Sequence, residues 1–293
     1  MLLGAHCSTA GGPHLALQRA AQIGAASCQI FVKNNMQWRG APFPPAALEL
    51  WRNAREQTKP QAVFGHAGYL INIARPESEV RRKSVLSLIQ EIELAASLAL
   101  PFLVLHPGAH LGAGEEAGLA QAVRTLDEVA SATRKFDVRI ALENTAGQGS
   151  CLGSRIEHLA AILSGVKNPR RFGICIDTAH LFAAGYDIRS REGWAQTISE
   201  VERLVGLDKV LAFHLNDSQT DLGSRVDRHA HIGKGKIGRA GFSHVVNDVR
   251  FRLLPACIET PKSEDLHEDI QNLRVLRSLL HKPLNTAAQI TSK

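Results

Sequence analysis

The sequence contains no apolar run long enough to cross a membrane. Its longest nearly apolar stretch covers residues 94–105 and is interrupted by Ser97 and Pro101, whereas a membrane-spanning helix needs about 20 apolar residues in succession. Residues 1–6 also lack the basic segment and long apolar segment that mark a secretory signal. These absences predict a cytoplasmic protein with no membrane partner.

Cysteines and aromatic residues are scarce. The 293 residues include five scattered cysteines and no C-x-x-C pair, and aromatic residues make up 5% of the chain. An odd number of scattered cysteines argues against a disulfide framework and is typical of a reducing compartment. Apolar residues at 44% and charged residues at 21% are ordinary for a globular protein and argue against disorder. The net charge of +6 suits an anionic partner but does not identify one.

Short β-rich apolar runs alternate with amphipathic segments along the chain. We predict eight strands, at residues 2–5, 28–32, 62–65, 102–105, 139–142, 172–176, 210–213 and 256–258. Eight repeats of strand and helix favour a single closed (β/α)8 barrel, the α/β fold called the TIM barrel, over an open doubly wound sheet. We assign residues 1–282 to the barrel domain and residues 283–293 to a C-terminal tail.

The segments between the strands carry apolar residues at helical spacing. Residues 85–99 and 119–130 each present one apolar stripe, as expected of helices that pack on a sheet. Ser154 and Glu157 form a capping box, which predicts the start of another helix. A final helix is predicted to begin near Ser263 and to carry Leu266 and Leu280.

Six of the eight apolar runs end in a side chain that can bind a metal ion. These side chains are His66, His106, Glu143, Asp177, His214 and Glu259. The carboxyl ends of the strands in a TIM barrel meet at one mouth, where active sites are built. Groups that are far apart in the sequence are therefore expected to point into one cavity. Without cations, so many carboxylates and imidazoles would repel and desolvate one another.

Two local clusters add three further groups. His180 follows Asp177 where the chain turns into a helix, and Asp227 and His229 lie two residues apart in a glycine-bearing loop. In an extended segment, residues i and i+2 face the same side, so Asp227 and His229 can share one ion. At about three or four ligands per ion, the nine groups supply two or three metals. Imidazole and carboxylate without thiolate suit Zn²⁺, with Mn²⁺ or Fe²⁺ as alternatives.

The other histidines are assigned lesser roles. His6 ends the first apolar run, but that strand is short, and we do not count His6 as a ligand. His110 and His231 lie near the clusters and are interpreted as supporting or structural groups. Surface positions are expected for the remaining five, which are His14, His158, His244, His267 and His281.

Seven segments carry or flank the nine groups. They are Leu105–Gly108, Leu142–Gly149, Cys175–His180, Ala183–Asp187, His214–Ser218, Gly223–His229 and Ile258–Thr260. In this order they resemble endonuclease IV, the AP endonuclease family 2 of DNA repair. Residues 4–12 and 33–39 are similar to the first two loops of that family, so the resemblance covers nearly the whole chain.

The resemblance implies a TIM barrel with three zinc ions at its mouth. One zinc would be held by His66, His106 and Glu143, and Glu143 would bridge to a second. The second ion would also be bound by Asp177, His214 and Glu259, and the third by His180, Asp227 and His229. All nine positions carry the residue type that the family requires.

The resemblance also implies a reaction. The family hydrolyses the phosphodiester on the 5′ side of an abasic nucleotide in double-stranded DNA, leaving a 3′-hydroxyl and a 5′-deoxyribose phosphate. Many members also clear blocked 3′ ends. Metal coordination lowers the pKa of the attacking water, and Glu143 and Glu259 are the expected catalytic carboxylates, which orient that water or accept its proton. With no appended domain visible, the protein is expected to be a monomer.

Loop residues are expected to contact the DNA. Gln37 and Tyr69 lie where the family inserts side chains into the duplex. A basic residue is common one position before Gln37, but this chain has Met36, which is either an apolar wedge or an ordinary packed loop residue. The side chains expected at phosphates are Arg39, Arg225, Arg228, Lys234 and Lys236.

Two alternatives remain. A xylose-isomerase-like sugar isomerase or epimerase would also use carboxylates, a histidine and one or two metals in a TIM barrel, but it has no need of a third metal loop at Asp227 and His229. A non-catalytic DNA-binding barrel would use its metals structurally, although structural zinc sites are usually closed by thiolates. Metal content and DNA cleavage distinguish these alternatives from a hydrolase.

Overall fold

The structure, a computed structural model, describes residues 1–281. The predicted tail at residues 283–293 and the last residue assigned to the barrel domain lie outside the described residues. Within residues 1–281, no helix is both long enough and apolar enough to cross a membrane.

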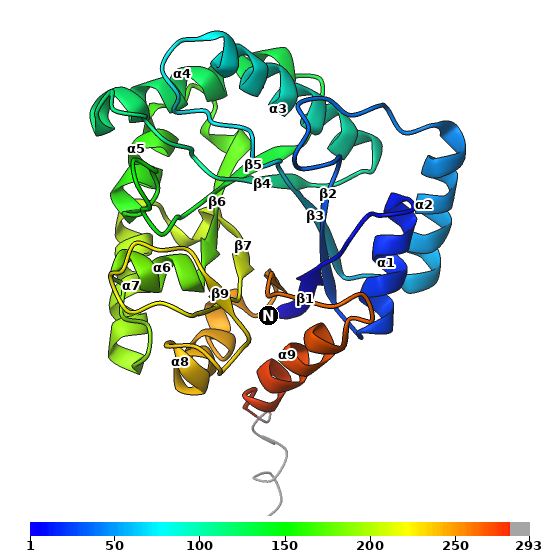
Figure 1. The fold of residues 1–293 in the computed structure, drawn as a ribbon, viewed down its shortest axis with the longest axis vertical. Helices are drawn as coiled ribbons and strands as arrows, with labels where there is room; N and C mark the ends of the chain where they lie inside the picture. Colours follow the sequence, from blue (N-terminus) through cyan, green and yellow to red (C-terminus); the bar gives the residue numbers. More distant parts are fainter. Residues whose placement is uncertain (282–293) are drawn as a thin grey trace, which may run out of the picture.

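Eight parallel strands close into a barrel, in the order β1-β10-β7-β6-β5-β4-β3-β2 (Figure 1). The strands are β1 (Leu2–His6), β2 (Ser27–Phe31), β3 (Ala62–His66), β4 (Phe102–Leu105), β5 (Arg139–Glu143), β6 (Phe172–Asp177), β7 (Val210–His214) and β10 (Pro255–Ile258). The eight predicted strands and the closed TIM barrel are confirmed. A short antiparallel pair, β8 (Asp217–Ser218) and β9 (His229–Ala230), follows β7.

Helices surround the barrel (Figure 1). They are α1 (Pro13–Gln22), α2 (Pro45–Thr58), α3 (Glu79–Ser97), α4 (Glu115–Ala132), α5 (Ile156–Gly165), α6 (Thr178–Ala184), α7 (Arg191–Leu204), α8 (Gly238–Val246) and α9 (His267–Ser278). The 3-10 turns η1 (Pro169–Arg171), η2 (Leu207–Lys209) and η3 (Val249–Phe251) complete the elements. The predicted stripe on α3 packs inward, because Val85, Leu88 and Ile92 are buried.

Two predicted helices are present, but the capping box expected for one and the start expected for the other were wrong. Helix α5 begins at Ile156 with no side-chain cap, so Ser154 and Glu157 form no capping box; the hydroxyl of Tyr186 accepts from the Ile156 amide instead, at 3.1 Å. Helix α9 begins at His267 because Leu266 adopts a left-handed backbone conformation with φ 61°, which breaks the helix before it. Leu280 lies beyond the end of α9.

The barrel interior is filled by a small cluster of apolar side chains. It contains Phe64, Phe102, Val104, Ala141, Cys175, Leu211, Ala212 and Cys257. Burial raises the pKa of the Cys175 and Cys257 thiols to about 12, so both are neutral packing groups, as expected. Because apolar side chains fill the interior, polar side chains can be placed at the carboxyl ends of the strands, above this packed core.

Candidate metal centre

Four of the barrel strands run one residue further than predicted and end on a candidate ligand. β3 ends at His66, β5 at Glu143, β6 at Asp177 and β7 at His214. Their backbone is therefore part of the paired sheet, as in the register that sets Asp177 beside His214. This strand pairing fixes the backbone position from which each of these four side chains extends.

Four histidines surround the carboxylate of Glu143, which is completely buried. Oε2 of Glu143 lies 2.9 Å from His106 Nε2 and 3.3 Å from His66 Nε2. Oε1 lies 2.8 Å from Nδ1 of His214 and 3.3 Å from Nδ1 of His180. One carboxylate thus joins four imidazoles, of which three come from strand ends and the fourth from α6.

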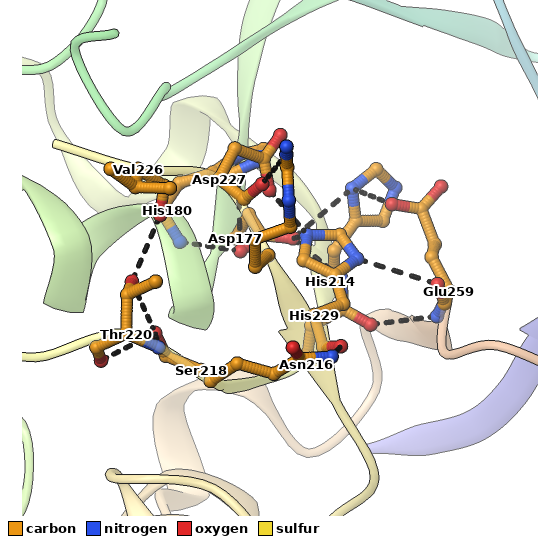
Figure 2. Close-up of polar contacts among 12 residues, drawn as sticks. Asp177, His180, His214, Asn216, Ser218, Thr220, Val226, Asp227, His229 and Glu259 are labelled. Atoms are coloured by element: carbon orange, nitrogen blue, oxygen red, sulfur yellow. Dashed lines mark hydrogen bonds and ion pairs between the residues drawn. The ribbon is translucent and has the colours of Figure 1, made fainter.

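The remaining groups gather beside them (Figure 2). Asp227 reaches two histidines, with Oδ2 3.1 Å from His180 Nε2 and Oδ1 3.2 Å from His229 Nε2. Thr220 holds the loop that presents Asp227, because its hydroxyl donates to the Val226 carbonyl at 2.9 Å. Asp177 caps α6, with Oδ1 accepting from the His180 amide at 2.8 Å.

Eight of the nine residues fall into three groups whose potential ligand atoms lie within 4.8 Å of one another. The groups are His66, His106 and Glu143; Glu143, Asp177, His214 and Glu259; and Asp177, His180 and His229. The first two contain the residues named for the first two zinc ions. In the third, Asp177 stands where Asp227 was expected, while Asp227 contacts both histidines. The structure brings all nine together, and their binding of metal stays a prediction.

Four histidines are fixed by one ring nitrogen, which leaves the other facing the cluster. The fixing contacts are His66 Nδ1 to Ala67 O at 2.7 Å, His180 Nδ1 to Asn144 O at 2.9 Å, His214 Nε2 to Gln29 Oε1 at 2.7 Å and His229 Nδ1 to Glu259 O at 3.3 Å. A ring nitrogen that donates to an oxygen leaves its partner nitrogen free to bind a cation. Metal-binding histidines are typically oriented in this way.

The Nε2 atom of His229 supports the same interpretation. It is buried, and its neighbours in the described range are two carboxylate oxygens, Asp227 Oδ1 at 3.2 Å and Asp177 Oδ2 at 3.9 Å, neither of which makes a well-aligned hydrogen bond to it. Buried nitrogens are rarely left without a partner. A donor set of imidazoles and carboxylates without thiolate therefore fits Zn²⁺ or a similar divalent cation.

Charge pairing shifts the pKa values within the cluster. Burial disfavours the Glu143 carboxylate, yet His214 and His106 hold its pKa well below its usual range. Burial likewise opposes ionisation of Glu259, and His214 and His6 lower its pKa. Burial also opposes charge on His229, but Asp227 raises the pKa of that imidazole to about 9. The carboxylates are thus ionised at neutral pH, and a cation must displace protons from imidazole.

Sequence reasoning missed the amides that hold the ligands. Gln29, completely buried in β2, accepts from His214 and donates from Nε2 to Glu259 Oε1 at 2.5 Å. Asn216 donates to Asp177 Oδ2 at 2.6 Å and accepts from the Glu259 amide at 2.7 Å. A glutamine inside a buried apolar run and an asparagine two residues after a ligand were the available signals.

Some assignments of the other histidines were wrong. β1 is a full strand paired with β2 and β10, so the reason for setting His6 aside fails; its Nδ1 lies 2.9 Å from Gln29 Nε2 and 3.7 Å from Glu259 Oε1. His158 is buried and does not lie on the surface. Its Nδ1 accepts a hydrogen bond from the Gly153 amide at 3.0 Å.

The remaining histidines lie outside the cluster. His110 Nδ1 accepts from the Gly114 amide at 3.1 Å and His231 Nδ1 contacts Asn272 Nδ2 at 3.1 Å, which are structural roles. The other positions are half-buried for His14 and His244 and exposed for His267 and His281.

The cluster opens into a cavity of about 630 Å³ whose lining includes Tyr69, Arg228 and Glu259. Tyr69 is 60% exposed, and its ring meets the edge of Phe31 with 5.3 Å between centroids. Partial desolvation of its hydroxyl, with the nearby carboxylates of Glu259 and Glu143, raises the pKa of Tyr69 to about 12, so the phenol is neutral. Of the predicted DNA contacts, Tyr69 and Arg228 thus lie beside the candidate metal ligands.

The other predicted DNA contacts are exposed and do not line this cavity. Met36, which is 64% exposed, Gln37 and Arg39 occupy the loop between β2 and α2. Arg225 and Lys234 lie on the segment between β7 and α8. Lys236 in that segment pairs with Asp221 at 3.3 Å. DNA contact by these residues stays a prediction.

The sequence is similar to known proteins along most of its length. The sequence matches the xylose isomerase-like TIM barrel family over residues 17–279. A probable endonuclease 4 from Chloroflexus aurantiacus is 50% identical over 277 residues, which cover 94% of this chain and 97% of that protein. A probable endonuclease 4 from Citrifermentans bemidjiense is 43% identical over 279 residues, which cover 95% and 99% of the two chains.

Solved structures give the same result. Endonuclease IV from Thermus thermophilus superimposes with a TM-score of 0.83 and 36% identity, covering 95% of this chain and 98% of that one. A D-tagatose 3-epimerase-like protein has a TM-score of 0.73 but 18% identity over 95% of this chain and 97% of its own, and shares the fold alone. The chain therefore belongs to the xylose isomerase-like TIM barrel family and, within it, to the endonuclease IV enzymes.

Proposed function

We propose that this enzyme repairs double-stranded DNA by hydrolysing the phosphodiester on the 5′ side of an abasic nucleotide, leaving a 3′-hydroxyl and a 5′-deoxyribose phosphate. The observation that carries the proposal is the gathering of nine imidazole and carboxylate groups beside a cavity of about 630 Å³. The endonuclease names of relatives that align along nearly the whole chain support the same reaction class.

The proposed cofactor is Zn²⁺, three ions per chain, with Mn²⁺ or Fe²⁺ able to substitute. His66, His106 and Glu143 would hold one ion. Glu143 would be shared with a second that Asp177, His214 and Glu259 complete, and His180, Asp227 and His229 would hold the third. When bound, such ions supply Lewis-acid stabilisation of the phosphate and activate a water molecule as nucleophile.

The two catalytic carboxylates have different surroundings and so different proposed roles. The Glu143 side chain is completely inaccessible and contacts four imidazoles, so it orients them. The Glu259 side chain is 17% exposed and lines the cavity. Gln29 donates to its Oε1, and His214 Nδ1 lies 3.3 Å from its Oε2. The carboxylate is thus held at the cavity, where it would accept the proton of the attacking water.

Side chains at the cavity rim would hold the substrate. The Arg228 guanidinium lies beside the ligands and suits a phosphate. Met36, Gln37 and Tyr69 would enter the duplex, while Arg39, Arg225 and Lys234 would contact flanking phosphates. Blocked 3′ ends are also phosphate esters of the terminal sugar, so we include removal of 3′ blocking groups in the proposal.

The proposed setting is a monomer in the cytoplasm. All five cysteines are free, and free thiols are typical of a reducing compartment.

The test is cleavage of a labelled duplex that carries one tetrahydrofuran site, with an undamaged duplex as control. We expect a single nick 5′ to the site that is lost with a chelator and restored by Zn²⁺. An uncut abasic duplex under metal-replete conditions would contradict the proposal. Turnover of a ketose sugar without nicking would indicate an epimerase instead.

A further inference from the structure

A buried ion pair lies outside the candidate metal centre. Lys33, in the loop after β2, and Glu91, on α3, meet with 2.9 Å between Nζ and Oε1, and their side chains are only 3% and 1% exposed. Burying two charges is costly unless further hydrogen bonds compensate the desolvation. The additional partners of this pair therefore indicate what it holds together.

Those partners belong to two loops at the mouth of the barrel. The Lys33 ammonium also donates to the carbonyl oxygen of Gln37 at 2.5 Å. The Glu91 carboxylate accepts from the Gly68 amide, at 3.0 Å to Oε2 and 3.3 Å to Oε1. Gln37 lies beside Met36, and Gly68 precedes Tyr69, so the pair joins the two segments that carry the proposed intruding side chains.

Gln90, next to Glu91 on α3, ties the far end of the first loop. Its amide group makes two hydrogen bonds to the backbone of Gly40, accepting from the amide at 2.9 Å and donating to the carbonyl at 2.8 Å. The loop of residues 33–40 is thus fixed to α3 near both of its ends. We call Lys33, Gln90 and Glu91 the loop clamp.

Gly68 shows how closely the loops approach the clamp. A Cβ at this position would lie 3.1 Å from the Asn35 carbonyl oxygen, 3.1 Å from Lys33 Nζ and 3.2 Å from Glu91 Oε1. A side chain at this position would therefore press against the loop backbone and both charged groups. Both loops converge on the same two charged atoms.

We propose that the loop clamp positions Met36, Gln37 and Tyr69 relative to one another and thereby sets the affinity for abasic DNA without touching the substrate. This inference rests on the proposed function, because it assigns these side chains to lesion recognition. Preordered loops avoid part of the ordering cost of binding. A misplacement of about 1 Å can cost up to about a hundredfold in rate.

The experiment compares Glu91→Gln, Gln90→Ala and the control Glu79→Gln in the metal-loaded enzyme. Glu79 is on the same helix and also pairs with a lysine, Lys83 at 2.9 Å, but that pair is exposed and holds no loop. Each variant is assayed on the tetrahydrofuran duplex and on bis(4-nitrophenyl) phosphate, a small phosphodiester with no duplex to enter. A 2-aminopurine base opposite the lesion reports by its fluorescence how far the loops disturb stacking.

For Glu91→Gln we expect KM on the abasic duplex to rise about tenfold or more, with a weaker 2-aminopurine signal and unchanged hydrolysis of the small substrate. Gln90→Ala, which leaves the buried charges paired and so preserves folding, should show a smaller change of the same kind. Two results together overturn the proposal. The first is an unchanged KM in Gln90→Ala. The second, in Glu91→Gln, is either an unchanged KM or an equal loss of activity on both substrates. Failure of the wild type to cut the duplex would instead refute the proposed function.

Discussion

The mouth of the barrel carries two kinds of polar residue, on strand ends and on loops. Glu143, Asp177 and His214 terminate strands, are completely buried and are held by further hydrogen bonds. Met36 and Tyr69 lie on loops and are 64% and 60% exposed. Both sets face the same end of the molecule, but folding fixes the first set far more tightly than the second.

This difference separates chemistry from recognition. Groups mounted on paired strands are placed accurately before any substrate arrives, whereas exposed side chains, even on loops whose backbone is held, keep rotamer freedom that binding must restrict. Changes to the candidate metal ligands, on strand ends or in the held loop of Asp227, should therefore reduce kcat or metal content, whereas changes to exposed loop side chains outside that cluster should chiefly raise KM. Each prediction below tests that division.

The largest effect is expected for Glu259→Gln. The amide keeps the shape of the side chain but cannot accept a proton, so kcat on the abasic duplex should fall by roughly 10²–10⁴-fold. DNA binding, measured by fluorescence anisotropy, should change little. If the variant lost DNA binding together with cleavage, Glu259 would have a role in binding the DNA rather than in the chemical step.

Asp227→Asn should come next, because it weakens the group that contacts His180 and His229. We expect metal content, measured by mass spectrometry, to fall by about one ion per chain, with roughly a 10²-fold loss of kcat. Asp221→Asn, an exposed acid in the same segment, is the matched control and should keep full metal content.

Gln29→Met should weaken the site from outside the ligand set. The variant keeps the volume of the side chain but removes its hydrogen bonds to His214 and Glu259, and such contacts are worth roughly 10–100-fold in metal affinity or activity. Competition with a fluorescent chelator gives the affinity. Ile30→Val, a packing change in the same strand, is the control; equal losses in both would attribute the effect to packing.

Tyr69→Ala should act on recognition alone. Loss of an aromatic contact should raise KM by roughly tenfold, while kcat and metal content stay as in the wild type. Val249→Ala removes an equally exposed apolar side chain, 76% exposed, from the turn before β10 and should change neither constant. A fall in kcat with constant KM would break the division between strand ends and loops.

The smallest effect concerns protons. In the metal-free protein the pKa of His229 is raised to about 9, so its ion pair stabilises the fold fully below about pH 6.5 and is lost as the pH rises through 9. Metal binding follows the opposite trend, because the cation displaces that proton and gains affinity as the pH rises. Calorimetry of zinc binding at pH 7, in buffers of different ionisation enthalpy, gives the number of protons released. His229→Asn should release about one proton fewer than the wild type.

The same division describes what could be predicted from the sequence. Strand ends were predictable, because Glu143 or His214 after an apolar run needs only the barrel topology to be placed at the mouth. The third group of ligands was less predictable. Asp177 lies beside His180 and His229 because of the direction of its side chain, which is held by a hydrogen bond from Asn216. The supporting role of Gln29 depends on which strands become neighbours, and the Lys33–Glu91 pair depends on how α3 packs, so neither follows from local sequence patterns.

The most direct test of the whole account is a crystal structure with anomalous diffraction at the zinc edge. We predict three strong anomalous peaks per chain at the mouth of the barrel, within bonding distance of the nine imidazole and carboxylate groups. Peaks elsewhere on the molecule, or no peak at this mouth in protein loaded with zinc, would contradict it.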